Sequence, residues 1–262
     1  MNASRLLFAC ILAQPLLAQS VDYGTRSAAL AGHQSVLQAA SATLYANPAM
    51  LAALTAPAVQ LGYFQPYQLA GVAGKSLSAA QCTGRLAVAA GVAEFGNRLY
   101  REQFFSAAAG GMLTSAFSAG LRLNWLRTSI VNYGNWNRFT FDLGAAFMPG
   151  GPLQYGVLLK NLASGSAARE IRTGIAWTLQ QNNTLYFEVI RLRNQPAALT
   201  FAAKFSIHPR FAVLAGTGYN TPVSLSAGLL LAFPRLRFTY AVQLHSTLAA
   251  THRFAFTFQG GQ

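Results

Sequence analysis

Charged residues are scarce in this sequence, and acidic residues are the scarcest of them. Asp and Glu contribute six residues and Lys and Arg 19, so that only 10% of the 262 residues are charged and the formal net charge is +13. A soluble globular domain carries about 25% charged residues. Because 53% of the residues are hydrophobic, the composition favours a membrane protein or an unusually buried one.

Cysteine is also scarce, and one of the two cysteines lies in an apparent export signal. Arg5 precedes the apolar run 6–17, which is too short to cross a bilayer and is followed by small or polar residues. We therefore expect residues 1–20 to be a signal peptide that is removed, with lipid attachment at Cys10 as the alternative. Removal leaves Cys82 alone, and a single cysteine forms no internal disulfide.

Residue types that carry catalysis are few. Histidine occurs at His33, His208, His245 and His252. Ser246 follows His245, but adjacent strand residues point to opposite faces and cannot form a nucleophile–base pair. No His and Cys cluster has zinc-ligand spacing, and the basic residues form no nucleic-acid-binding motif. We expect no enzymatic activity, no catalytic residue, no metal, no cofactor and no nucleic-acid partner.

Long hydrophobic runs are missing as well. A membrane-spanning helix needs roughly 18 consecutive apolar residues. The uncharged stretch 27–74 does not provide them, because Gln and Ser interrupt it and Pro48 and Pro57 break it. No other stretch after the signal meets this length. A membrane protein with this sequence therefore has to cross the bilayer without helices.

Apolar residues instead recur with a period of two from Leu86 onward, which indicates strands. About fourteen such segments follow Pro57, separated by turn signals such as Pro149–Pro152. Clear examples are residues 117–125, 138–147, 171–177, 199–207, 236–244 and 253–258. A length of about ten residues matches a tilted strand in a bilayer, and an even strand number fits an outer-membrane barrel.

We therefore predict an all-β fold, a transmembrane antiparallel β-barrel of about 14 strands over residues 58–262. The predicted location is the bacterial outer membrane, with its lipid as a partner. The alternative is a soluble β-sandwich, whose strands are usually five or six residues long and whose outer face carries more charge. Candidates for interfacial aromatic girdles are Tyr63, Tyr67, Tyr100, Trp125, Trp136, Trp177, Tyr219 and Tyr240.

Strand alternation also places charged residues on the inner face of the predicted barrel. The expected lumen-facing charges are Arg122, Arg138, Asp142, Lys160, Arg172, Glu188, Lys204, Arg237 and Arg253. One interpretation is a basic lumen that holds or passes anionic or amphipathic ligands. The other is structural: each charge pairs with a neighbour or hydrogen-bonds an inserted segment, as intramembrane charges usually do.

The segment before the first strand, residues 21–57, is a candidate for such an inserted hatch. We expect a first helix within residues 27–45, ended by Asn47-Pro48, and a second at residues 50–54. The alternative is an exposed periplasmic tail, although exposed tails are usually rich in charge.

The hatch segment also resembles a known family. The stretches "YGTRSAALAG" and "SATLYANPAMLA", residues 23–32 and 41–52, are similar to the start of PorV/PorQ-like barrels, within the superfamily of the long-chain fatty-acid transporter. The similarity continues at residues 141–165, 214–233 and 248–258. It implies a fourteen-stranded barrel with an N-terminal hatch, and it marks Leu44, Tyr45, Asn47, Pro48 and Ala49 as the hatch motif.

The resemblance implies two functions. The first is a component associated with type IX secretion that docks or shuttles exported proteins, with secretion-machinery subunits or exported proteins as partners. The segment 129–138, "SIVNYGNWNR", is the candidate loop for gripping such a protein. The alternative is a channel for hydrophobic or amphipathic small molecules, similar to the fatty-acid transporter, with a hydrophobic ligand.

Overall fold

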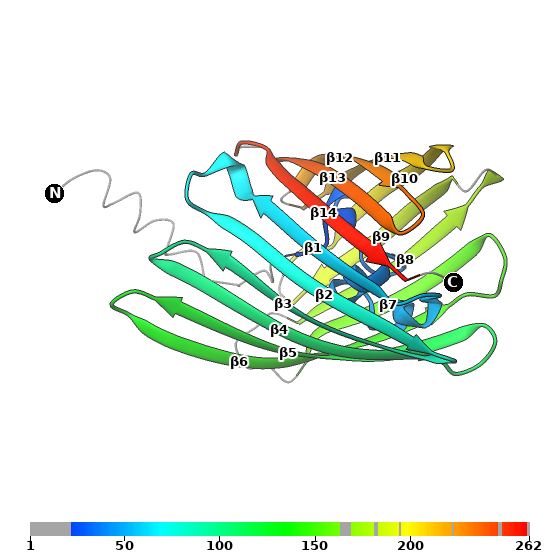
Figure 1. Ribbon diagram of the computed structural model, residues 1–262, viewed down its shortest axis with the longest axis horizontal. Coiled ribbons are helices and arrows are strands. Elements are labelled where there is room, and N and C mark those ends of the chain that lie inside the picture. Colours follow the sequence, from blue (N-terminus) through cyan, green and yellow to red (C-terminus); the bar gives the residue numbers. More distant parts are fainter. Residues whose placement is uncertain are drawn as a thin grey trace.

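Fourteen antiparallel strands form a closed barrel in the computed structural model, which describes residues 22–162, 169–180, 183–193, 195–221, 223–245 and 248–260 (Figure 1). Each strand pairs with its sequence neighbours, and β1 pairs with β14 to close the wall. The predicted fold class is confirmed. The expected signal peptide lies outside the described residues.

The strands are β1 Ala58–Gln65, β2 Ala73–Thr83, β3 Leu86–Gly96, β4 Tyr100–Met112, β5 Phe117–Ile130, β6 Gly134–Phe147, β7 Leu153–Leu162, β8 Glu170–Thr178, β9 Thr184–Leu192, β10 Ala198–His208, β11 Phe211–Tyr219, β12 Val223–Ala232, β13 Leu236–His245 and β14 Thr251–Gln259. We call the end where β1 begins and β14 stops the terminal end; the C-terminus marks it in Figure 1. The opposite end, where β1 joins β2, is the distal end.

The two-residue period separates an apolar outer face from a polar inner face. On β5, Leu121 and Leu123 are 42% and 57% exposed, whereas Arg122 between them is 3% exposed. Large apolar side chains are exposed on many other strands, which suits a hydrocarbon environment and not water. Among the described residues, no helix has both the length and the apolar character to span a bilayer.

Two of the predicted girdle aromatics do not lie on this outer face. Tyr67 lines a cavity inside the barrel and packs against His245 with ring centroids 4.7 Å apart. Tyr100 donates a hydrogen bond to Glu102, which lines the inner space. Their prediction was wrong because Tyr67 lies in the 3₁₀ turn Pro66–Gln68 between β1 and β2 and Tyr100 is the first residue of β4, and an aromatic side chain alone does not reveal which face it occupies.

The candidate protein-gripping loop is a tight strand hairpin. β5 continues to Ile130 and β6 begins at Gly134, so three residues form the turn. Tyr133 at its tip is 78% exposed. The pairing of β6 with β7 reaches only to Phe141, so the outer half of β6 pairs with β5 alone. The segment therefore extends the wall and forms no separate loop.

Residues 22–57 fold inside the barrel as a plug, shown in blue in Figure 1. We call residues 22–57 the hatch. Its helices are α2 Thr25–Ala29 and the 3₁₀ helices η1 Ala40–Tyr45 and η2 Pro48–Ala53. Most of its side chains are buried, and its Ala and Leu residues pack against alanines of the wall.

The expected long first helix was wrong in extent. The chain turns back after α2, with left-handed backbone at Ala31 and again at Ala40. Between these turns, Glu188 of β9 accepts hydrogen bonds from two hatch backbone N–H groups. Because the wall satisfies these donors, the hatch does not need a continuous helix to bury its backbone.

Candidate functional site

Asn47 ties the hatch to itself and to the wall. Its Nδ2 donates to the carbonyl oxygens of Ser35, Ala145 and Val157 at 2.7, 3.2 and 3.2 Å. Its Oδ1 accepts from the Ala49 N–H at 3.0 Å and so caps η2. One fully buried amide therefore joins two hatch segments with β6 and β7.

The wall makes room for the hatch with glycines. A Cβ at Gly144 would overlap the Asn47 side-chain oxygen, and a Cβ at Gly110 would overlap the Pro48 carbonyl oxygen. Other strand glycines that face hatch atoms are Gly91, Gly120, Gly156, Gly174, Gly216 and Gly228. The hatch backbone therefore lies directly on the inner surface of the sheet, which only residues without a side chain allow.

Two other motif residues, Leu44 and Tyr45, anchor η1. Leu44 is fully buried. The Tyr45 hydroxyl donates to the carbonyl oxygens of Leu77 and Val92 at 3.1 and 3.3 Å. Burial raises the pKa of Tyr45, so the hydroxyl stays neutral and available as a donor. The Tyr23 ring packs 5.7 Å from the Tyr45 ring, which adds an apolar contact at this anchor.

Arg122 joins the hatch to an acidic residue of the wall. Its Nη2 lies 2.6 Å from the Asp142 carboxylate, and both side chains are buried. Its Nη1 donates to the carbonyl oxygens of Leu44 and Ala46. Asn124 donates to the same carboxylate at 2.7 Å. The guanidinium thus donates to carbonyl groups at the end of η1, which have no backbone N–H donor within the helix.

A second cluster of charges lies on β7, β8 and β9. Arg172 contacts Glu188 at 2.9 Å and also pairs with Glu170. The Lys160 ammonium lies 3.8 Å from Glu170. Arg172 also donates to the carbonyl oxygen of Gly32 at 2.7 Å. Buried charges of opposite sign compensate one another here and hold the hatch turn.

Glu188 is the acceptor for the centre of the hatch. It receives hydrogen bonds from the N–H groups of Gln34 and Ser35 at 3.0 and 2.6 Å. His33 lies beside it, with Nδ1 3.8 Å from the carboxylate and the ring 5.0 Å from that of Tyr186. His33 is fully buried, and this burial lowers the pKa of its imidazole despite the nearby carboxylate.

The remaining lumen-facing charges occupy three places. Arg253 donates to Gln243 at 2.8 Å and to the Asp22 carbonyl oxygen at 2.5 Å. Arg138 lines the inner space near the distal end. Lys204 and Arg237 line a cavity at the terminal end. The structure thus brings six of the nine charges into contact clusters around the hatch, and it places Arg138, Lys204 and Arg237 outside them.

Two larger cavities lie in the lumen on either side of the hatch, among the described residues. The distal cavity, about 340 Å³, mixes aromatic side chains such as Phe64 and Phe95 with Arg172 and Arg253. The terminal cavity, about 760 Å³, lies between the hatch and the ends of β7–β13. The sequence analysis missed these cavities, because their linings combine residues from many strands. A molecule that crosses the lumen has to displace or rearrange the hatch.

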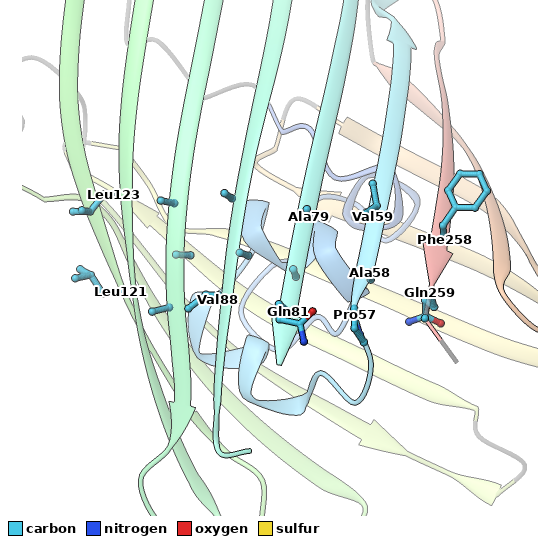
Figure 2. Close-up of a pocket in the computed structure, with 17 residues that line it drawn as sticks. Pro57, Ala58, Val59, Ala79, Gln81, Val88, Leu121, Leu123, Phe258 and Gln259 are labelled. Atoms are coloured by element: carbon cyan, nitrogen blue, oxygen red, sulfur yellow. The ribbon is translucent and has the colours of Figure 1, made fainter. Parts of the chain in front are cut away.

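A third hollow lies on the outer face, and Figure 2 shows the residues that line it. It measures about 870 Å³ and is floored by alanines of β2, β3 and β4. Larger side chains flank this floor, with Leu121 and Leu123 on one side and Phe258 on the other (Figure 2). Its lining is almost wholly apolar, as expected of a surface in contact with hydrocarbon.

Comparisons with known proteins find likeness in structure only. No family model matches the sequence, and no curated protein matches it. Solved structures with a similar fold include the monoaromatic hydrocarbon channel CymD, with 12% identity, a TM-score of 0.70 and coverage of 93% of this chain and 99% of that one. The Ralstonia pickettii toluene transporter TbuX has 10% identity, a TM-score of 0.70 and coverage of 90% and 98%.

A Pseudomonas aeruginosa FadL homologue is similar as well, with 10% identity, a TM-score of 0.63 and coverage of 89% and 97%. At such identities the likeness shows the fold and no more. Nothing in the comparisons supports the PorV/PorQ family or a type IX secretion role. The chain has the fold of the FadL-like hydrocarbon transporters, a fourteen-stranded barrel.

Proposed function

We propose that this protein is a bacterial outer-membrane channel for small hydrophobic or amphipathic molecules, with the hatch as its gate and without enzymatic activity. The observation that carries the proposal is a plug held inside a closed barrel by hydrogen bonds to buried polar and charged side chains of the wall, with a cavity on either side. The fold likeness to hydrocarbon channels and transporters supports it. The apolar outer face supports a location in membrane lipid.

The distal cavity suits the entry of a small amphipathic molecule. Phe64, Phe95 and Ile190 offer apolar contact, and Arg172 and Arg253 offer donors at its edge. Ligand pockets are commonly built from apolar walls with a few polar groups that set orientation. The hatch lies between this cavity and the terminal cavity, and hydrogen bonds join it to the wall.

The gate is expected to move through these polar contacts and not through the wall. Each net hydrogen bond contributes about 1 kcal/mol. Asn47 makes bonds to the wall at Ala145 and Val157 and an internal bond to Ser35. Loss of this single side chain therefore loosens the hatch, whereas the barrel keeps its closed ladder of backbone hydrogen bonds.

The test is uptake of radiolabelled toluene by cells that carry the barrel in a lipopolysaccharide-containing outer membrane. A bare phospholipid vesicle is unsuitable, because apolar molecules cross it unaided. Cells with the barrel should accumulate toluene several-fold faster than cells with an empty vector. Asn47→Ala should raise the rate further and should also admit a small hydrophilic solute that the unmodified barrel excludes.

Asn135→Ala is the matched control, because Asn135 is exposed at the β5–β6 hairpin, where its side-chain oxygen accepts from the Ser129 hydroxyl and does not contact the hatch in the described part of the chain. It should behave as the unmodified chain does. The amount of folded barrel is measured in every strain by its heat-modifiable gel mobility. Toluene uptake equal to the empty-vector rate, at normal barrel abundance, would contradict the proposed function.

A further inference from the structure

Among the described residues that line the terminal cavity, three side chains are cationic and none is acidic. Arg26 of the hatch, Lys204 of β10 and Arg237 of β13 all line this space of about 760 Å³. They come from segments far apart in the sequence and meet only in the folded barrel. Charges on the inner side of a membrane protein usually find partners of opposite sign. These three depart from that rule.

The acidic residues of the chain are all engaged elsewhere. The sequence has six, and the structure describes all of them. Their partners are Arg122 for Asp142, Arg172 for Glu170 and Glu188, Arg101 for Glu94, Tyr100 for Glu102 and Ser27 for Asp22. No acidic side chain therefore remains to neutralise the terminal cavity, unlike the two charge clusters that hold the hatch.

The guanidinium of Arg26 lacks a full set of hydrogen-bond acceptors. Its Nη1 donates to the carbonyl oxygen of Gln38 at 2.6 Å. Its Nε is buried and has no hydrogen-bond partner among the described residues. The positive charge of Arg26 also acts on both Lys204 and Arg237, so the three groups repel one another. A buried donor without an acceptor and a set of like charges both favour an incoming anion.

The rest of the lining suits an anion that carries a small organic group. Gln154, Thr178 and Thr184 place polar side chains around the cavity, and Val36 and Leu230 supply an apolar side. Guanidinium groups match the geometry of phosphate oxygens, and an ammonium adds a compact charge. Three positive charges are balanced more fully by a dianion than by a monocarboxylate.

We propose that the terminal cavity is a binding site for a dianionic oxyanion, a phosphate group either free or as the ester of a small molecule. Arg26, Lys204 and Arg237 form the positive side of the site. This proposal goes beyond the transport of apolar molecules, and its test measures equilibrium binding. Failure of toluene uptake and failure of phosphate binding are therefore separate results.

The experiment is isothermal titration of the purified full chain in detergent at constant ionic strength, with chloride as the background anion. The probes are inorganic phosphate, phenyl phosphate and benzoate. Both phosphates should bind, and benzoate should bind at least tenfold more weakly. Tighter binding of phenyl phosphate would assign the site to a phosphate ester, and equal or tighter binding of inorganic phosphate would assign it to the free ion.

Lys204→Gln and Arg237→Gln should each weaken phosphate binding at least tenfold. Arg235→Gln is the matched control, because Arg235 is an exposed cation at the same end of the barrel and does not line the cavity. Heat-modifiable gel mobility verifies that each variant folds. The proposal is overturned if neither phosphate binds, if benzoate binds as tightly, or if Arg235→Gln weakens binding equally.

Discussion

At the scale of single residues, the hatch is held by a few buried polar side chains that each serve several groups. Asn47, Arg122 and Glu188 each bond more than one backbone group of the hatch or wall. Groups of this kind are expensive to leave unpaired inside a protein, because water does not replace the lost partner. A change of charge or shape at one of them should therefore act on hatch position before it acts on the barrel.

His33 should make hatch docking dependent on pH. Its buried imidazole ring faces Glu188, Arg172 and Tyr186, and burial lowers the pKa of the imidazole below its usual value. A released hatch would expose His33 with an ordinary pKa of about 6.5. Below that pH the released state binds one more proton than the docked state, so docking weakens as the pH falls, by up to about tenfold per pH unit.

The measurement is hydrogen exchange of residues 25–54 at pH 7.5 and pH 5.5, expressed as protection factors so that intrinsic exchange rates cancel. Protection should fall at the lower pH in the unmodified chain. In His33→Gln the fall should be much smaller, because glutamine does not titrate. An equal fall in both proteins would refute a role for His33.

At the scale of elements, the hatch packs closely against the strands because glycines of the wall have no side chain in the way. Gly144 of β6 and Gly110 of β4 face the backbone or side chain of the hatch motif directly. In an isolated strand such glycines would weaken the sheet, since they bring no side chain to pack. Here the lost packing is replaced by the hatch itself, which fills the space against the wall.

Gly144→Ala should therefore dislodge the hatch and leave the barrel intact. The new methyl would overlap the Asn47 oxygen, and overpacking of this kind costs about 1–3 kcal/mol. Limited proteolysis should cut residues 22–57 faster, with the heat-modifiable mobility of the barrel unchanged. Gly151→Ala is the control, because Gly151 has open space around it and an ordinary backbone. Similar proteolysis of both variants would argue against the close fit.

At the scale of the whole molecule, the barrel has a polar interior and an apolar exterior, the pattern expected of a membrane barrel. The exposed large apolar side chains are distributed over nearly all strands, and many charged side chains of the wall, such as Arg122 and Glu188, are buried on the inner side. A low total charge is sufficient for this arrangement in a membrane, because an apolar outer face suits hydrocarbon and the hatch occupies part of the lumen. The same arrangement in water would leave a large apolar surface unprotected.

A lysine on the outer face should therefore impair insertion into the membrane. Leu123 of β5 is 57% exposed and flanks the apolar hollow on that face. Leu123→Lys should cost about 2–4 kcal/mol if the site lies near the bilayer midplane, as lysine does on the lipid face of barrels. The readout is the midpoint of urea unfolding in phospholipid vesicles. Val131→Lys in the β5–β6 turn is the control, and a midpoint lowered equally in both would contradict a lipid-facing β5.

The sequence alone determined the fold class, because a period of two over segments of about ten residues is a property of each strand and does not depend on which strands pair. The same alternation indicated which charges share the inner face. Its limits appeared where local pattern and tertiary position diverge: Tyr67 and Tyr100 point inward, and the hatch forms short helices where a longer one was expected. The hatch backbone follows acceptors such as Glu188 that lie far along the chain.

Only the tertiary structure decided which charges are paired and which are not. Arg122 and Lys204 look alike in an alternating strand, but Arg122 lies opposite Asp142 on the adjacent strand β6, whereas Lys204 shares a cavity with Arg26 and Arg237. Strand register determines the first pairing, and the path of the hatch and of distant strands determines the second, and local periodicity predicts neither. The terminal cavity and its uncompensated charge are therefore properties of the assembled barrel.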